Sequence, residues 1–187
     1  RSTLFSSGLV KWGSNYLQVR NTSVLEVTRS EIVESILQGK FSVSAALTGV
    51  ATLASPPTLR LRDFAHMQPM LDDLQRHLRI LIKHKRPGGN CLLYGPPGTG
   101  KTELARALAR SLRTTLFEIC YEKEDHSPLR AQTRLENCRL AQSLLCERRS
   151  LLLFDECEDV FRGEDIFSRG IGNQHKAWLN RLLETNP

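Results

Sequence analysis

The sequence predicts an α/β fold of three layers, in which helices cover both faces of a mainly parallel sheet. Two observations lead to this prediction. A glycine-rich segment, residues 95–102, lies between a short apolar run at 91–94 and an amphipathic run at 103–112. A second run, residues 151–156, is apolar except for its last two positions, which are acids. Short apolar strands that alternate with amphipathic helices are typical of parallel sheets covered on both faces.

Residues 95–102 match the phosphate-binding pattern G-x-x-x-x-G-K-[ST] at every fixed position. In such a loop the backbone N–H groups point inward and bind a polyphosphate, and glycines allow backbone angles that a Cβ would obstruct. The helix that follows directs its positive end at the same anion. The predicted nucleotide-binding residues are Gly95, Pro96, Pro97, Gly98, Thr99, Gly100, Lys101 and Thr102. The alternative is a surface turn with a solvated lysine, which the flanking strand and helix disfavour.

The apolar run 151–154 is expected to be a buried strand that carries Asp155 and Glu156 to the carboxyl edge of the sheet. There Asp155 and the Thr102 hydroxyl would hold Mg²⁺. Glu156 would orient and deprotonate the attacking water, and Lys101 would reach the β- and γ-phosphate oxygens, so these two are the predicted catalytic residues. The alternative interpretation is an ordinary helix start, because acids favour helix N-termini.

Residues 95–102 together with Leu-Leu-Phe-Asp-Glu at 152–156 resemble an AAA+ ATPase, and the resemblance covers about residues 62–187. It implies a P-loop NTPase core of αβα layers that binds ATP and Mg²⁺ and hydrolyses ATP to ADP and phosphate. It also implies a homo-oligomeric ring, such as a hexamer, that remodels a macromolecular partner. In this family a fourth strand with a sensor residue, an arginine finger and a helical lid would follow Pro187. We therefore expect residues 1–187 alone to be poorly stable and a weak or inactive ATPase, because strand groups would stay unpaired.

The remaining predicted elements fit this αβα order. Residues 116–120 are predicted as a second strand. Ser127 is the predicted N-cap, and Pro128 the first residue, of a helix. The buried positions expected on that helix are Ala131, Leu135, Cys138, Ala141 and Leu145. Residues 67–82 and 173–184 are predicted as amphipathic helices.

We expect two parts: an N-terminal region and linker of unknown role, residues 1–57, and a truncated ATPase core, residues 58–187. The first part is predicted to be small α+β or irregular. It holds an alternating strand pattern at 16–20 and a helix over 28–37 with a capping-box start and a glycine stop. Residues 41–59 carry no charge. We interpret them as a linker or partly packed segment, since Ser, Thr, Gly and Pro dilute them too much for a membrane span.

The composition is ordinary for a globular protein, with 40% hydrophobic and 25% charged residues. The net charge of +6 lies wholly before the phosphate loop: residues 1–89 hold 12 Lys and Arg against 6 Asp and Glu, and residues 90–187 hold 14 against 14. Basic residues that end a helix complement its dipole, and no nucleic-acid motif occurs. We therefore expect neither nucleic acid nor a membrane as a partner. Cysteines without C-x-x-C pairs look like small core residues in a reducing, cytoplasmic compartment. The five histidines show no spacing typical of a metal site.

Two alternatives to a hydrolysing AAA+ machine stay open. One is another P-loop enzyme, either a helicase, although a DEAD-type box would need Asp where the chain has Glu158, or a kinase. The other is a binding module that holds ATP as a switch without hydrolysing it, which Glu156 argues against. Residues 121–150 contain no glycine, so the aromatic–hydrophobic–glycine loop of threading unfoldases is absent.

Overall fold

A three-stranded mixed sheet forms the centre of the molecule. The structure is a computed structural model, and it describes residues 10–13, 24–27, 30–123, 125–158, 180–184 and 186. The strand order is β3-β4-β5, with β3 at Ala51–Leu53, β4 at Thr115–Ile119 and β5 at Ser150–Leu153. β4 pairs in parallel with β5 and antiparallel with β3. β5 therefore presents the carboxyl end of a parallel strand, where ligand sites of such sheets lie.

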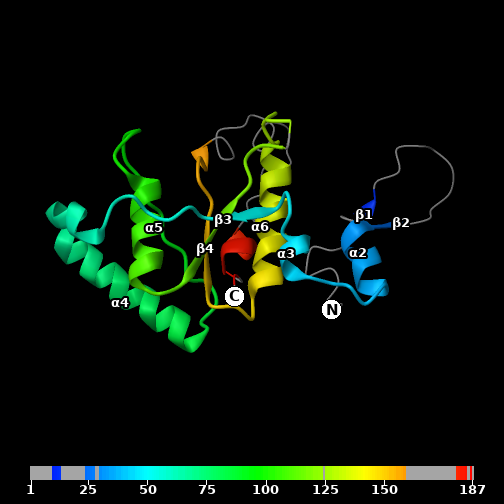
Figure 1. The fold of residues 1–187 in the computed structure, drawn as a ribbon, viewed down its shortest axis with the longest axis horizontal. Helices are drawn as coiled ribbons and strands as arrows, with labels where there is room; N and C mark the ends of the chain where they lie inside the picture. The colour runs from blue at the N-terminus through cyan, green and yellow to red at the C-terminus, as the bar shows by residue number, and fades with distance from the viewer. Residues whose placement is uncertain are drawn as a thin grey trace.

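One face of the sheet is covered by α5, Lys101–Ser111, and behind it by α4, Gln68–His84 (Figure 1). A 3₁₀ helix, η1 at Leu61–Met67, leads directly into α4. Apolar side chains at helical spacing on α5 meet others from η1 and α4. This first core consists of Phe64, Leu71, Leu104, Ala107 and Leu108, with Leu61, Met67, Leu74 and Leu93 partly buried against it. The core fixes the start of α5, which follows the glycine-rich loop.

The opposite face carries α6, Ala131–Leu145, with the short helix α3, Val43–Ala46, beside it (Figure 1). A second core of buried residues lies here: Ile32, Ala46, Leu47, Val50, Ala51, Ile119, Cys138, Leu140, Ala141, Leu145 and Leu182. From β4, Phe117 and Ile119 contact this second core, because residues two apart in a strand point to the same face. Helices on both faces of the sheet confirm the predicted αβα fold class, and the antiparallel β3, which the sequence did not predict, makes the described sheet mixed.

The N-terminal region combines strands and helices, as an α+β region does. β1, Val10–Gly13, and β2, Val24–Val27, pair antiparallel, and α2 spans Ser30–Leu37. Gly39 has φ of 67° just after α2, which is the glycine stop that the sequence predicted. The predicted strand at 16–20 and the Thr28 cap lie outside the described residues.

Residues 43–53 pack on the main sheet rather than apart from it. β3 extends the sheet through its pairing with β4, and Val50 is fully buried in the second core. This part of the uncharged segment is therefore packed on the sheet, and it lies on the N-terminal side of the boundary that we predicted at residue 57. The division into two domains itself stays a prediction. Among the described helices, none combines the length and the apolar character that crossing a membrane requires.

Two predicted elements were wrong. Residues 91–94 are not a strand: none of the described backbone hydrogen bonds joins them to a neighbour, and Leu92 and Tyr94 are 71% and 88% exposed. A strand needs a partner for its N–H and C=O groups. In the described part of the chain, β5 has no neighbouring strand on the side away from β4 with which residues 91–94 could pair. The helix predicted from Pro128 begins at Ala131 instead. Ser127 donates from N and Oγ to Asp125 Oδ1 at 2.9 and 2.6 Å, so it closes an Asx-type turn before the helix.

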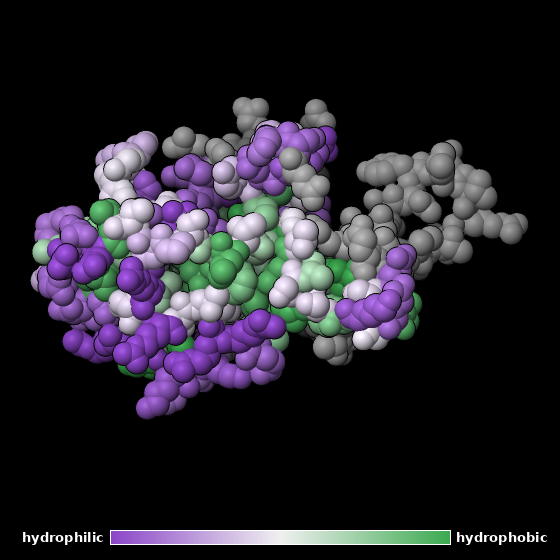
Figure 2. Space-filling view, viewed as in Figure 1, coloured by the Kyte–Doolittle hydropathy of each residue, from purple (hydrophilic) through white to green (hydrophobic). Residues whose placement is uncertain are grey.

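The predicted helix at 67–82 forms α4, which continues to His84. Only the end of the predicted helix at 173–184 is described, as a helical turn at 180–184. Of the five cysteines, all free, only Cys138 is buried, and burial raises its pKa to about 11. The buried position that we predicted for Cys138 is therefore confirmed, whereas Cys91 and Cys146 are exposed. Figure 2 shows apolar residues gathered over the middle of the sheet and polar residues over α4.

Candidate active site

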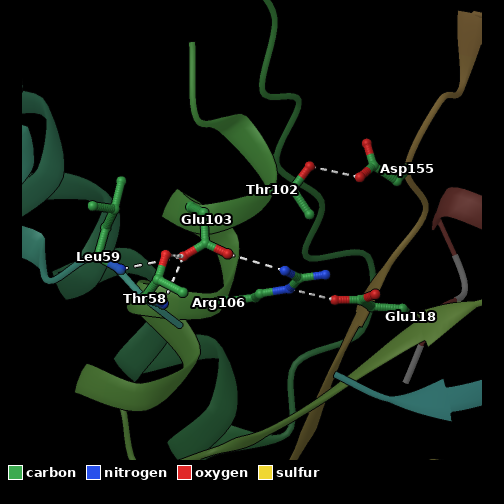
Figure 3. A network of polar contacts seen from close by, with 7 residues as sticks. All are labelled: Thr58, Leu59, Thr102, Glu103, Arg106, Glu118 and Asp155. Carbon is green, nitrogen blue, oxygen red and sulfur yellow. Dashed lines mark hydrogen bonds and ion pairs between the residues drawn. The ribbon is translucent and has the colours of Figure 1, made fainter. Parts of the chain in front are cut away.

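A direct hydrogen bond joins the two predicted metal-binding residues. Thr102 Oγ1 donates to Asp155 Oδ2 at 2.6 Å, although 53 positions separate the two residues (Figure 3). Thr102 lies in the first turn of α5, and Asp155 follows the end of β5. The phosphate-loop pattern and the acidic strand end therefore meet at one edge of the sheet.

The loop before α5 has the backbone that its glycines allow. Gly98 and Gly100 have φ of 76° and 82°, in the left-handed region that a residue with a Cβ adopts at a cost. Gly100 caps α5, and its carbonyl accepts the Leu104 N–H at 2.8 Å. Phe64 lies behind Gly100: a Cβ added there would be 3.4 Å from the Phe64 ring. The first core thus supports the loop at the point where the helix begins.

The Lys101 ammonium group folds back across the loop. Its Nζ donates to the carbonyl oxygens of Gly95 and Pro96, at 3.0 Å each. Thr99 Oγ1 also donates to the Pro96 carbonyl, at 2.9 Å. The lysine charge therefore lies over the same loop whose glycines the sequence pattern predicted to face a polyphosphate.

Glu156 lies next to Asp155 with an exposed side chain. Its backbone has φ of 49°, which is uncommon for a residue with a Cβ. The Glu156 N–H donates to Asp155 Oδ1 at 3.0 Å. The Asp155 carboxylate is thereby held on both oxygens, by the Thr102 hydroxyl on one and by the Glu156 amide on the other.

Sequence reasoning missed a polar network that ties α5 to the segment before η1 and to β4 (Figure 3). Glu103 Oε2 accepts hydrogen bonds from the Thr58 N–H and hydroxyl at 2.8 Å each and from the Leu59 N–H at 3.2 Å. Arg106 donates to Glu103 Oε1 at 3.0 Å and to Glu118 Oε1 at 2.7 Å. The network holds the first turn of α5, which carries Lys101 and Thr102. An i,i+3 pair of opposite charges on a predicted helix was the available clue.

The Glu103 network predicts a specific dependence of stability on pH. Hydrogen bonds from Thr58 and Leu59 lower the Glu103 pKa from 4.5 to about 2. A lowered pKa in the folded state stabilises the protein above the unfolded-state pKa, and this contribution is lost as the pH falls through the folded pKa. We expect the difference in free energy of unfolding between the wild type and Glu103→Gln to be constant above about pH 4.5 and to shrink toward pH 2. Denaturant titrations across this range would measure it, and a difference that stays constant down to pH 2 would contradict it.

Sequence reasoning also missed Arg134, which is 4% exposed and lies on the buried face of α6. Its Nη1 donates to the Glu156 carbonyl at 3.0 Å, and its Nη2 donates to the Asp155 carbonyl. Its guanidinium also lies over the Phe154 ring, 4.6 Å from the centroid. The spacing from Cys138 could have indicated burial, since residues four apart share a helix face.

The donor set fits Mg²⁺ bound together with a nucleotide. Mg²⁺ prefers oxygen ligands, keeps several waters and is often bound by one or two protein groups plus substrate phosphates. Thr102 Oγ1 and Asp155 Oδ2 are two such oxygens at adjacent positions. Among the described residues no group of three or more His, Cys, Asp or Glu side chains could hold a metal alone. These two side chains could hold a hydrated ion against a bound phosphate.

Comparison with known proteins agrees with this geometry. Residues 91–185, about half of the chain, match the family described as "ATPase family associated with various cellular activities (AAA)". The chain belongs to this AAA family. The match spans both the phosphate loop and the Asp155-Glu156 pair, so the resemblance that the two motifs indicated is confirmed.

Several curated proteins are similar to the chain. Protein SUPPRESSOR OF K(+) TRANSPORT GROWTH DEFECT 1 of Arabidopsis thaliana is 28% identical over 146 residues, 72% of this chain and 31% of that protein. An ATP-dependent zinc metalloprotease FtsH of Slackia heliotrinireducens is 37% identical over 144 residues, 71% of this chain and 18% of that protein. A replication factor C large subunit of Sulfolobus acidocaldarius is 28% identical over 106 residues, 56% of this chain and 24% of that protein. The chain spans less than a third of each relative, and no solved structure gives a significant match.

Proposed function

We propose that the protein binds ATP with Mg²⁺, hydrolyses it to ADP and phosphate, and uses the cycle to remodel a macromolecular partner. The observation that carries this proposal is the 2.6 Å hydrogen bond between Thr102 and Asp155. It brings a hydroxyl from the phosphate loop and a carboxylate from the sheet edge to one point. Membership of an ATPase family supports ATP binding and hydrolysis in general.

Each side chain has a separate role in this proposal. The amides of residues 95–102 and the α5 N-terminus bind the phosphates, and Lys101 exchanges its loop carbonyls for β- and γ-phosphate oxygens. Thr102 and Asp155 hold the metal, which neutralises charge on the phosphates when it is bound. Glu156 accepts a proton from the attacking water. The exposed position of the Glu156 side chain leaves it accessible to that water.

The proposed oligomer and macromolecular partner rest on family membership alone. We propose a homo-oligomeric ring in the cytoplasm, in which a neighbouring subunit completes the site. The absence of glycine from residues 121–150 argues against gripping a polypeptide with the usual aromatic–hydrophobic–glycine loop. A non-hydrolysing switch is the second candidate function. The presence of Glu156 beside Asp155 favours hydrolysis over that candidate.

Asp155→Asn tests the metal site in the intact protein. The amide keeps a hydrogen-bond acceptor for the Thr102 hydroxyl and loses the charge that attracts Mg²⁺. We expect the Mg²⁺ concentration that gives half-maximal ATP hydrolysis to rise at least about tenfold, because a charge-assisted contact contributes about 1.5–3 kcal/mol. Titrating steady-state hydrolysis with MgCl₂ measures this.

The matched control for this titration is Asp72→Asn. Asp72 is exposed on α4 and accepts a hydrogen bond from Gln68. We expect its Mg²⁺ requirement to equal that of the wild type. An Asp155→Asn protein with an unchanged Mg²⁺ requirement would remove the metal site from the proposal. A wild type that binds ATP and releases no phosphate would favour the switch.

A further inference from the structure

Arg134 holds three consecutive residues at the point where β5 ends. Its guanidinium donates to the Asp155 and Glu156 carbonyls and lies over the Phe154 ring. The pairing of β5 with β4 extends only to Leu153. Beyond that residue the strand ladder no longer supplies donors, and buried carbonyl groups need other partners. The flat fork of an arginine, with parallel N–H groups, suits two neighbouring acceptors.

The turn that Arg134 holds also sets the positions of both carboxylates. Glu156 adopts φ of 49°, a conformation that is unfavourable for a residue with a Cβ and persists only where surrounding contacts determine it. Within this turn the Glu156 N–H donates to Asp155 Oδ1 at 3.0 Å. The same turn brings Asp155 Oδ2 to Thr102. Release of the two carbonyls would therefore loosen both acids.

Stability alone does not explain an arginine at this position. Removing a guanidinium from water costs free energy, and a well-packed apolar side chain in its place is often neutral or stabilising. The described hydrogen-bond acceptors of Arg134 are neutral carbonyls. None of these contacts is therefore an ion pair that would offset the cost of removing the guanidinium from water. The arginine gives something that an apolar residue cannot, namely fixed donors for the turn.

We propose that Arg134 is a positioning residue, whose guanidinium fixes the turn at 154–156 and thereby aims the Asp155 and Glu156 carboxylates. The effect of Arg134 on ATP hydrolysis rests on the proposed function. The contacts by which Arg134 fixes the turn do not depend on that function. Arg134 acts through the turn and not by contact with the nucleotide. Loss of the fork therefore lowers turnover and leaves nucleotide affinity nearly unchanged.

Arg134→Lys in the intact protein tests this proposal with two readouts. The lysine keeps the positive charge but replaces the fork with one ammonium group. The first readout is the alkylation rate of Cys157 by iodoacetamide, quantified on its peptide, because Cys157 directly follows the turn and is partly buried. We expect Cys157 to react several-fold faster, since local opening exposes it. Retaining the charge limits any change in the fraction of reactive thiolate.

The second readout is ATP hydrolysis together with ATP binding. We expect kcat to fall about 10- to 100-fold, since misplacing a reacting group by about 1 Å has such an effect, while the Kd for ATP stays within about threefold. In a Glu156→Gln background Arg134→Lys should lower the residual turnover by a smaller factor than in the wild type, because only the position of Asp155 is then left to lose. An equal fold-loss in both backgrounds would show that Arg134 acts independently of Glu156, and would overturn the proposal.

The chain supplies its own controls. Arg130→Lys makes the same chemical change at an exposed position beside the start of α6, and it should change neither readout. Cys146 is exposed at the far end of α6, and its alkylation rate should stay unchanged. Cys138 is buried within α6 and should stay unreactive while the helix is folded. If Arg134→Lys exposes Cys138, both readouts are measured on Phe154→Leu instead. This variant removes the ring beneath the guanidinium and should give a smaller change in the same direction.

The remaining outcomes are decisive. Unchanged Cys157 reactivity would show that Arg134 does not hold the turn, whatever happens to turnover. Faster Cys157 alkylation with unchanged kcat would show that the turn does not aim the acids. Either result overturns the proposal. A wild type without ATPase activity, in which Arg134→Lys still exposes Cys157, would refute the proposed hydrolysis and uphold the hold of Arg134 on the turn.

Discussion

Glu156→Gln should reduce ATP hydrolysis by about 100- to 1,000-fold while ATP still binds, because general base catalysis contributes roughly 10²–10⁴-fold. The amide has nearly the shape of the carboxylate and cannot accept the proton of the attacking water. The substitution should leave the turn intact, since its hydrogen bonds use the Glu156 backbone and not the side chain. Single-turnover hydrolysis measured beside equilibrium ATP binding separates the two effects.

The matched control for that experiment is Glu136→Gln on α6. The Glu136 side chain accepts a hydrogen bond from Gln132 one turn away, and its loss should leave turnover unchanged. A Glu156→Gln protein that hydrolyses ATP at the wild-type rate would remove Glu156 as the base. If it instead loses ATP binding, the side chain has a binding role that the proposed mechanism does not include.

The sequence predicted two of the three strands of the described sheet well and did not predict the third. β4 and β5 lie within one residue of their predicted positions, because each is a short apolar run between a helix and a polar turn. β3 was not predicted, since Ala51–Leu53 is short and lies in an uncharged segment without alternation. Strands depend on their neighbours, and the neighbour of β3 lies more than 60 positions away in the chain. The same dependence explains why the apolar run at 91–94 is not a strand.

In the candidate site, too, some contacts could be predicted from the sequence and others could not. The meeting of Thr102 with Asp155 could be anticipated, because loops and acids that follow parallel strands collect at one edge of the sheet. The roles of Arg134 and Glu103 could not. Both side chains bond largely to backbone groups of residues far away in the chain, namely the Asp155 and Glu156 carbonyls and the Thr58 and Leu59 amides. Backbone acceptors and donors carry no residue identity, so no sequence pattern indicates such partners.

Lys101→Ala should weaken ATP binding by about 10- to 100-fold, and turnover should fall with it. A hydrogen bond between charged groups contributes about 1.5–3 kcal/mol, and each 1.4 kcal/mol changes the dissociation constant about tenfold. The Lys101 ammonium also bridges the Gly95 and Pro96 carbonyls. Its removal therefore deletes a tie across the loop as well as a phosphate contact. Calorimetric titration of the intact protein with ATP measures the loss.

Two further variants, Lys101→Arg and Lys83→Ala, show whether that loss of ATP binding comes from the lost charge or from the shape of the side chain. Lys83 is exposed near the end of α4, and its removal takes away the same charge without touching the loop, so ATP binding should stay at the wild-type level. Arginine at 101 keeps the charge but presents a wide, planar fork in place of a compact ammonium. If charge alone held the phosphates, this variant would bind ATP almost normally. We expect Lys101→Arg to bind ATP weakly, because the Gly95 and Pro96 carbonyls, each 3.0 Å from Nζ, suit a compact ammonium group better than a wide guanidinium. Full affinity in Lys101→Ala would mean that the glycine loop does not hold the nucleotide through this residue.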